Sequence, residues 1–221
     1  MSADRLLRWG GLSLIIGGVL SPLSIAIHPS QETVVTILGQ TWRLIAGHIL
    51  TTASIIFILL GMLGLYVFEA DKAGRLGLAG FLLAFTGNVL LATSSNYGYI
   101  APVLAAHAPA MLTEINAYGP EIGLDALMVF TYIPGFVLLG IATVRAGKLP
   151  RLGGVLISAG ALMFFIGFGI ANGTPFAAAY WIGLFGQVLF GLGFIMLGLK
   201  LWMGGKISAD ELLRAPIRPA A

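Results

Sequence analysis

Residues 44–68 read LIAGHILTTASIIFILLGMLGLYVF, a stretch of 25 residues without one charged side chain. A helix needs about 20 apolar residues to cross ~30 Å of hydrocarbon. After the charged segment EADKAGR at 69–75, a second uncharged run follows at 76–95. Two such runs, separated by a few charged residues, predict a pair of membrane-spanning helices joined by a short turn.

The composition of the whole chain agrees with this interpretation. Hydrophobic residues make up 58% of the 221 residues and charged residues 10%, and the mean hydropathy is +0.96. A water-facing fold does not tolerate such values. The apolar runs are continuous rather than alternating, which favours helices over a barrel. We expect an all-α membrane protein with six transmembrane helices, at 9–27, 44–68, 76–95, 124–144, 152–171 and 178–202.

Basic residues predict the orientation. If the loop after the first span is outside, eleven Lys and Arg residues lie inside and only Arg43 lies outside. By the positive-inside rule, both termini are then cytoplasmic, and the protein is a multi-pass protein of a cell's inner (plasma) membrane. Residues 1–206 would form the membrane domain and 207–221 a short cytoplasmic tail. Basic residues in the cytoplasmic segments also explain the net charge of +3, so no nucleic-acid partner is expected.

Short motifs recur at equivalent ends of the expected helices. Outgoing helices begin with RWGG at 8–11, RLG at 75–77 and RLGG at 151–154. Returning helices contain FILLG at 57–61, FVLLG at 136–140 and FIMLG at 194–198. The pattern indicates three parallel two-helix hairpin repeats, at 8–68, 75–145 and 151–202. The alternative is chance similarity among membrane helices that begin with Arg and Gly.

Polar residues inside the expected spans gather in the outer half. Such side chains are costly in lipid and are rarely without a role. His48 and Thr52 lie four residues apart, on one helix face. An unpaired carboxylate at Asp125 would tend to bind a proton or to find a partner such as His48 or Arg43. The candidate binding residues for an outward pocket are His28, Trp42, His48, Thr52, Asn88, Asp125 and Gln187.

Simpler roles exist for most of these residues. Amides such as Asn88 and Gln187 commonly join helices by hydrogen bonds worth ~0.6 to 2 kcal/mol each. Trp42 falls near a span end, where an aromatic belt is expected. His48 can equally be a packing residue that donates to a carbonyl group or to Asn88.

Metal and cofactor chemistry is not expected. The chain has no cysteine, and no two of the candidate histidines share a helix at ligand spacing. His28 would lie near the interface and His48 about six residues, or ~9 Å, deeper, which argues against a shared haem. Motifs for phosphate, dinucleotide or metalloprotease sites are also absent. These observations favour a protein that is not an enzyme.

Several short motifs carry a family resemblance. They are His28-Pro29, Trp42, His48, GLY at 64–66, AGRLG at 73–77, RAG at 145–147 and LPR at 149–151. With them the chain resembles small six-helix membrane proteins of actinobacterial and related genomes, whose function is unknown. The resemblance implies a six-helix fold in a bacterial inner membrane and no particular activity.

Three functions remain open. The first is the binding or transport of a small molecule, lipid or ion in the outer half of the bundle. The second is a structural or accessory role, in which glycine-rich faces dock on a larger membrane complex or on another copy of the chain. The third is an intramembrane enzyme that uses His48 and Asp125 for proton transfer.

Overall fold

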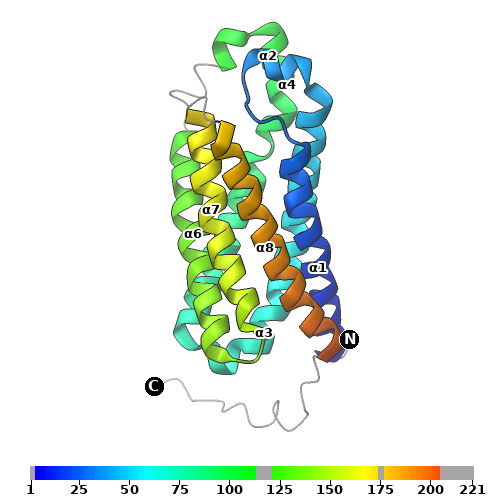
Figure 1. Ribbon diagram of the computed structural model, residues 1–221, viewed down its shortest axis with the longest axis vertical. Coiled ribbons are helices and arrows are strands. Elements are labelled where there is room, and N and C mark those ends of the chain that lie inside the picture. Colours follow the sequence, from blue (N-terminus) through cyan, green and yellow to red (C-terminus); the bar gives the residue numbers. More distant parts are fainter. Residues whose placement is uncertain (1–2, 113–120, 174–176, 205–221) are drawn as a thin grey trace.

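The computed structural model describes residues 3–112, 121–173 and 177–204, and this part of the chain is helical apart from short connections. It contains no strand, so the all-α prediction is confirmed for the described residues. The expected tail at 207–221 lies outside them. The helices are α1 (Ala3–Ile27), α2 (Val34–Gly39), α3 (Thr41–Ser94), α4 (Tyr97–His107), α6 (Glu121–Ala146), α7 (Arg151–Gly173) and α8 (Ala177–Gly204) (Figure 1).

Several helices have the length and apolarity needed to cross a membrane. In the described part of the chain these are Asp4–Ile27, Thr41–His107, Gly123–Ala146 and Ala179–Gly204, and Arg151–Gly167 is a shorter apolar helix. The protein is therefore a helical membrane protein. Each expected span coincides with helical structure. The spans expected at 44–68 and 76–95 both fall on α3, and the second extends one residue past its end.

Helix α3 is not straight. At Gly74 the backbone has φ 57° and ψ −156°, which is not a helical conformation. The rings of Tyr66 and Phe81 stack at a centroid distance of 4.7 Å. Fifteen residues of straight helix would separate them by about 22 Å. The chain therefore reverses at Gly74, and α3 consists of two antiparallel arms, 41–73 and 75–94.

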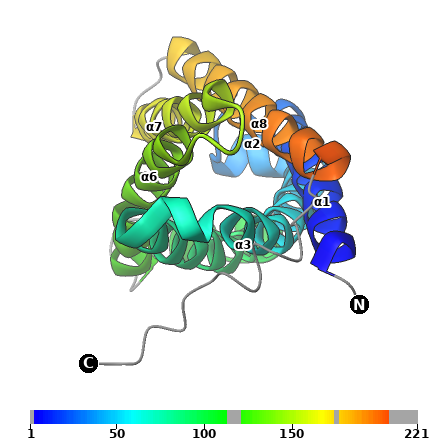
Figure 2. The same ribbon diagram turned by 90° about the horizontal axis from the view of Figure 1, so that it is seen from below.

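The long helices surround a common axis (Figure 2). Helix α1 packs on the first arm of α3 and on α8, the second arm packs on α6, and α6, α7 and α8 follow in order. Aromatic side chains fill the middle of the bundle with edge-to-face contacts, which suit the charge distribution of their rings. They are Tyr132, Phe136, Phe190 and Phe194, each at most 2% exposed.

Glycine allows the helix backbones to approach closely. A Cβ atom added to Gly11 would lie 2.6 Å from the carbonyl oxygen of Gly198, and one added to Gly18 would lie 2.6 Å from that of Gly191. Both pairs join α1 to α8. In lipid, apolar surface gains nothing by leaving the solvent, so close packing of this kind drives helix association.

A small apolar cap covers one end of the bundle. Helices α2 and α4 lie together above α1 and α3 at the top of Figure 1. Thr33 caps α2 by accepting a hydrogen bond from the backbone N–H of Thr36. The buried residues of the cap are Ile37, Leu44, Ala101, Ala105 and Leu112. The cap closes over the first turns of α3, where His48 lies.

The reversal of α3 predicts a specific sensitivity at Gly74. We expect Gly74→Ala to lower the free energy of unfolding by roughly 1–3 kcal/mol, because an L residue is strained at this positive φ. No atom lies within 4 Å of the added Cβ, so the cost comes from the backbone alone. Gly123→Ala, also in open space but inside a helix, is the control and should be neutral or slightly stabilising. Thermal unfolding in detergent measures both, and equal melting temperatures for Gly74→Ala and wild type would contradict the account.

Candidate metal centre

The end of α1 is held by two donors from other helices. The Tyr180 hydroxyl of α8 donates to the carbonyl oxygen of Ile25 at 2.8 Å. The Arg43 Nε of α3 donates to the carbonyl oxygen of Ile27 at 2.8 Å. Carbonyl groups in the last turn of a helix have no partner within the helix, so such donors fix the end in place. The residue that follows immediately is His28.

His28 lies beside the first arm of α3. A Cβ atom added to Gly47 would be 3.0 Å from the His28 Cδ2 and 3.2 Å from its Cα. Glycine at position 47 therefore makes room for His28, which is 4% exposed. His48 follows Gly47 directly, so the two histidines are brought to the same level of the bundle.

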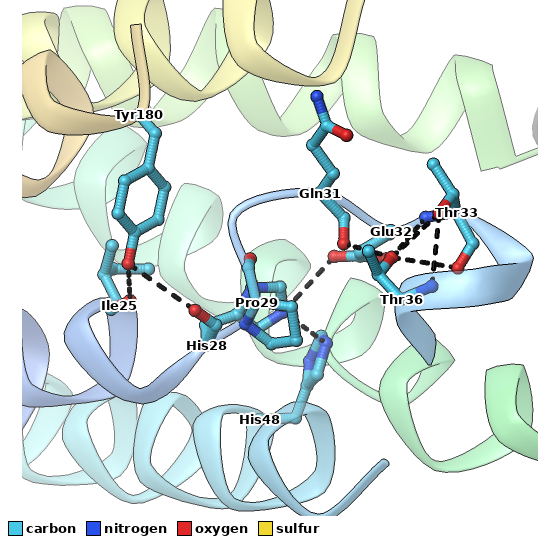
Figure 3. Close-up of polar contacts among 9 residues, drawn as sticks. All are labelled: Ile25, His28, Pro29, Gln31, Glu32, Thr33, Thr36, His48 and Tyr180. Carbon is cyan, nitrogen blue, oxygen red and sulfur yellow. Dashed lines mark hydrogen bonds and ion pairs between the residues drawn. The ribbon is translucent and has the colours of Figure 1, made fainter. Parts of the chain in front are cut away.

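Three side chains converge at this level (Figure 3). The Nε2 atom of His28 is 3.3 Å from the Nε2 of His48 and 3.3 Å from the Oε1 of Glu32. The ligand atoms of all three residues lie within 4.8 Å of one another. We call these residues the His–Glu cluster.

Backbone groups orient both imidazole rings. The His28 Nδ1 is 2.7 Å from the carbonyl oxygen of Pro29, which only accepts hydrogen bonds, so Nδ1 carries a proton. His48 forms a hydrogen bond with the backbone of Ser95. A Cβ atom on Gly98 would overlap the His48 ring, so glycine there makes room for it. The Nε2 atom of His28 is thus directed at the other two members of the cluster.

Glu32 supplies the only carboxylate of the cluster. Its side chain is 19% exposed and comes from the connection between α1 and α2. Burial raises the pKa of this carboxyl, but the hydrogen bond with His28 and the positive charges of His28 and His48 outweigh burial. The net result is a pKa below the usual value, so the carboxylate form is favoured.

A small cavity of mixed polar and apolar lining lies deeper in the bundle. Its volume is about 30 Å³, which is room for two or three water molecules. Drug-sized ligands need roughly 300–1,000 Å³. The Ser21 hydroxyl donates to the Gln187 side-chain oxygen, and the Asn88 Nδ2 donates to the Ala84 carbonyl oxygen at 2.9 Å. Its polar lining consists of Ser21, Ser24, Thr51, Ser54, Asn88, Tyr132 and Gln187.

The structure divides the predicted site residues into three groups. His28 and His48 meet in the His–Glu cluster, and Asn88 and Gln187 line the separate cavity. The others join neither: Thr52 is half-buried outside the cavity lining, Trp42 is 69% exposed, and Asp125 is exposed.

The expected partner of Asp125 was wrong. Its Oδ1 accepts a hydrogen bond from the Ser94 hydroxyl at 2.9 Å, whereas His48 contacts His28 and Arg43 bonds to Ile27 and Gln40. Asp125 lies at the outer surface of α6, where Ser94 is the neighbouring donor. A proton-transfer pair of His48 and Asp125 therefore has no geometric support.

The expected difference in depth between His28 and His48 was also wrong. If both helices ended at one level, His28 would lie about 9 Å above His48. Helix α3 instead begins at Thr41 and extends past the end of α1, so His28 lies level with Gly47. Glu32 was not among the candidate residues. The available signal was its spacing of four residues from His28 in a short polar connection.

Comparison with protein-family models, with curated proteins and with solved structures finds no match to this chain.

The depressed pKa of Glu32 predicts a pH-dependent stability. A carboxyl whose folded pKa is lowered stabilises the fold above its unfolded value of 4.5, and this contribution is lost as pH falls through the folded value. Chelator-treated wild type should therefore melt above Glu32→Gln at about pH 6. The difference should shrink below pH 4.5.

Thermal melts across this range, followed by circular dichroism in detergent, measure the effect. Asp4→Asn, at an exposed carboxylate outside the cluster, is the control and should keep the wild-type profile. A constant difference between wild type and Glu32→Gln at every pH would contradict the account.

Proposed function

We propose that the protein binds a divalent transition-metal ion of the Zn²⁺ class at the His–Glu cluster. The observation that carries this proposal is the convergence of two imidazole nitrogens and one carboxylate oxygen within 4.8 Å, with His48 from α3 and His28 and Glu32 from the connection between α1 and α2. The sequence predicts a protein that binds a small molecule, a lipid or an ion, and the His–Glu cluster favours an ion.

The distances fit one central ion. Ligands held about 2.0–2.1 Å from a tetrahedral Zn²⁺ lie about 3.3 Å from one another. The spacings from His28 Nε2 to His48 Nε2 and to Glu32 Oε1 are both 3.3 Å. The remaining pair is no further apart than 4.8 Å, so a small rotation of the Glu32 side chain completes the face of a tetrahedron.

The surroundings also fit a metal ligand set. A histidine that binds a metal characteristically donates its other ring N–H to a carbonyl or carboxylate, as His28 does to Pro29. Two imidazoles with one carboxylate suit Zn²⁺ and its neighbours, whereas Ca²⁺ and Mg²⁺ prefer oxygen ligands alone. Three protein ligands leave a fourth position for water or another exchangeable ligand.

Binding is favoured over passage through the bundle. Beyond the small cavity, the axis is filled by the packed rings of Tyr132, Phe136, Phe190 and Phe194. The Tyr132 hydroxyl is the one polar group among these four side chains, too few to replace the hydration of an ion. The proposed activity is therefore metal binding at one end of the bundle.

The proposed topology has six spans and places the cluster outside the cell. In this topology the two arms of α3 are separate spans. The distribution of basic residues favours a cytoplasmic location for both termini, in a bacterial cell. The hairpin repeat has some support in the packing. Gly11 meets Gly198, and Gly154 meets Gly140, so equivalent motif positions face each other at two interfaces.

Metal titration tests the proposal. We expect detergent-purified, chelator-treated protein to bind one Zn²⁺ per chain by calorimetry. His28→Ala and His48→Ala should each weaken binding more than about 100-fold, because they remove a ligand rather than a supporting group. His107→Ala is the matched control, since His107 is the third histidine of the chain and is exposed on α4. Wild-type affinity in either ligand variant would refute the proposal, as would equal loss in His107→Ala.

A packing variant tests the geometry without removing a ligand. In Gly98→Ala the new Cβ overlaps the His48 ring, so the imidazole must leave its position in the cluster. We expect Zn²⁺ affinity to fall about 10–100-fold, as for the loss of a supporting group. Gly123→Ala, which meets no neighbouring atom, should bind like wild type. Unchanged affinity in a folded Gly98→Ala protein would show that the metal is held elsewhere.

A further inference from the structure

A second unusual group lies at the opposite end of the bundle. Glu69, five residues before the reversal at Gly74, is only 1% exposed. Its Oε2 accepts a hydrogen bond from the Thr143 hydroxyl of α6 at 2.8 Å. Its Oε1 is buried and has no hydrogen-bond partner in the described part of the chain. One of the two oxygens of this carboxyl group is therefore left without a donor.

The nearest cation is engaged elsewhere. The Lys148 Nζ lies 2.6 Å from the Asp71 Oδ1 and 3.2 Å from the carbonyl oxygen of Phe68. It also lies 5.5 Å from the centre of the Phe68 ring. Asp71 has 55% of its side chain exposed, so this ion pair is at the surface and does not neutralise Glu69 directly. Lys148 and Asp71 are the charged groups of the described chain that act on Glu69.

Apolar residues lie one turn away from the hydrogen bond between Glu69 and Thr143 on both helices. One turn before Glu69 is Leu65, and one turn before Thr143 is Leu139, and both belong to the buried core. An ionised carboxylate that is buried with a single hydrogen bond is strongly unfavourable. A proton bound to the carboxyl removes this charge. Ionisable side chains inside membrane bundles commonly mark sites that take up and release protons.

We propose that Glu69 is a reversible proton-binding site at the end of the bundle away from the His–Glu cluster. The site consists of the Glu69 carboxyl and the Thr143 hydroxyl, and the surface ion pair of Lys148 and Asp71 lies beside it. The proposal does not depend on metal binding, because the two sites share no residue and lie at opposite ends of the first arm of α3.

Labelling with a hydrophobic carbodiimide tests this site. N,N′-dicyclohexylcarbodiimide enters apolar regions and reacts with a protonated carboxyl. The carboxyl oxygen adds to the central carbon of the reagent, the carboxyl proton moves to a reagent nitrogen, and an acyl shift gives a stable N-acylurea. Nothing leaves, so the peptide gains the mass of one reagent molecule, which mass spectrometry assigns to a residue.

With the full chain in detergent, we expect the adduct on Glu69. Its yield should be at least about tenfold lower at pH 9 than at pH 6, because the ionised form does not react. Glu69→Gln should abolish the adduct, and Asp71→Asn should retain it, since Asp71 is the exposed neighbour. The infrared C=O band of a protonated carboxyl, present in wild type and absent in Glu69→Gln, gives a second readout that needs no labelling.

Three results would overturn the proposal. The first is an adduct on Asp71 in place of Glu69. The second is no adduct on Glu69 together with no infrared difference between wild type and Glu69→Gln. The third is protection of Glu69 by Na⁺ at constant pH, which would make the group a metal-cation site rather than a proton site.

Discussion

Backbone contact at glycine is the constraint on which the rest of this structure depends. Gly11 and Gly198, and Gly18 and Gly191, bring α1 and α8 so close that neither pair has room for a Cβ atom. Within lipid the hydrophobic effect does not hold helices together, so dispersion contacts at this range must do so. Glycine also lets α1 approach the first arm of α3, where Gly47 makes room for the side chain of His28.

The His–Glu cluster follows from this packing. Tyr180 of α8 and Arg43 of α3 hold the end of α1, and the chain then turns with His28 beside Gly47. Glu32 returns to the same place four residues later. Two imidazoles and one carboxylate are thus placed by contacts among α1, α3 and α8, which is the rigid support that a metal site requires.

The sequence predicts the helices well and the site only in part. Uncharged runs of about 20 residues have one physical solution in a membrane, so each expected span coincides with a helix. Asn88 and Gln187 both line the small cavity, because amides deep in a span turn away from lipid. The relative heights of neighbouring helices are not encoded in hydropathy. That is why His28 and His48 were expected at different depths, although their nitrogens lie 3.3 Å apart. Glu69 was not a candidate for a related reason. It lies at the boundary between an apolar run and a charged turn, and its burial depends on tertiary packing.

The most direct test of the central claim is X-ray absorption at the zinc edge of the Zn²⁺-loaded protein. The account predicts a first shell of nitrogen and oxygen at about 2.0–2.1 Å, with the outer-shell scattering of two imidazole rings. One ring should disappear in His48→Ala. A spectrum without imidazole scattering, or one unchanged in His48→Ala, would contradict the assignment of the metal to the His–Glu cluster.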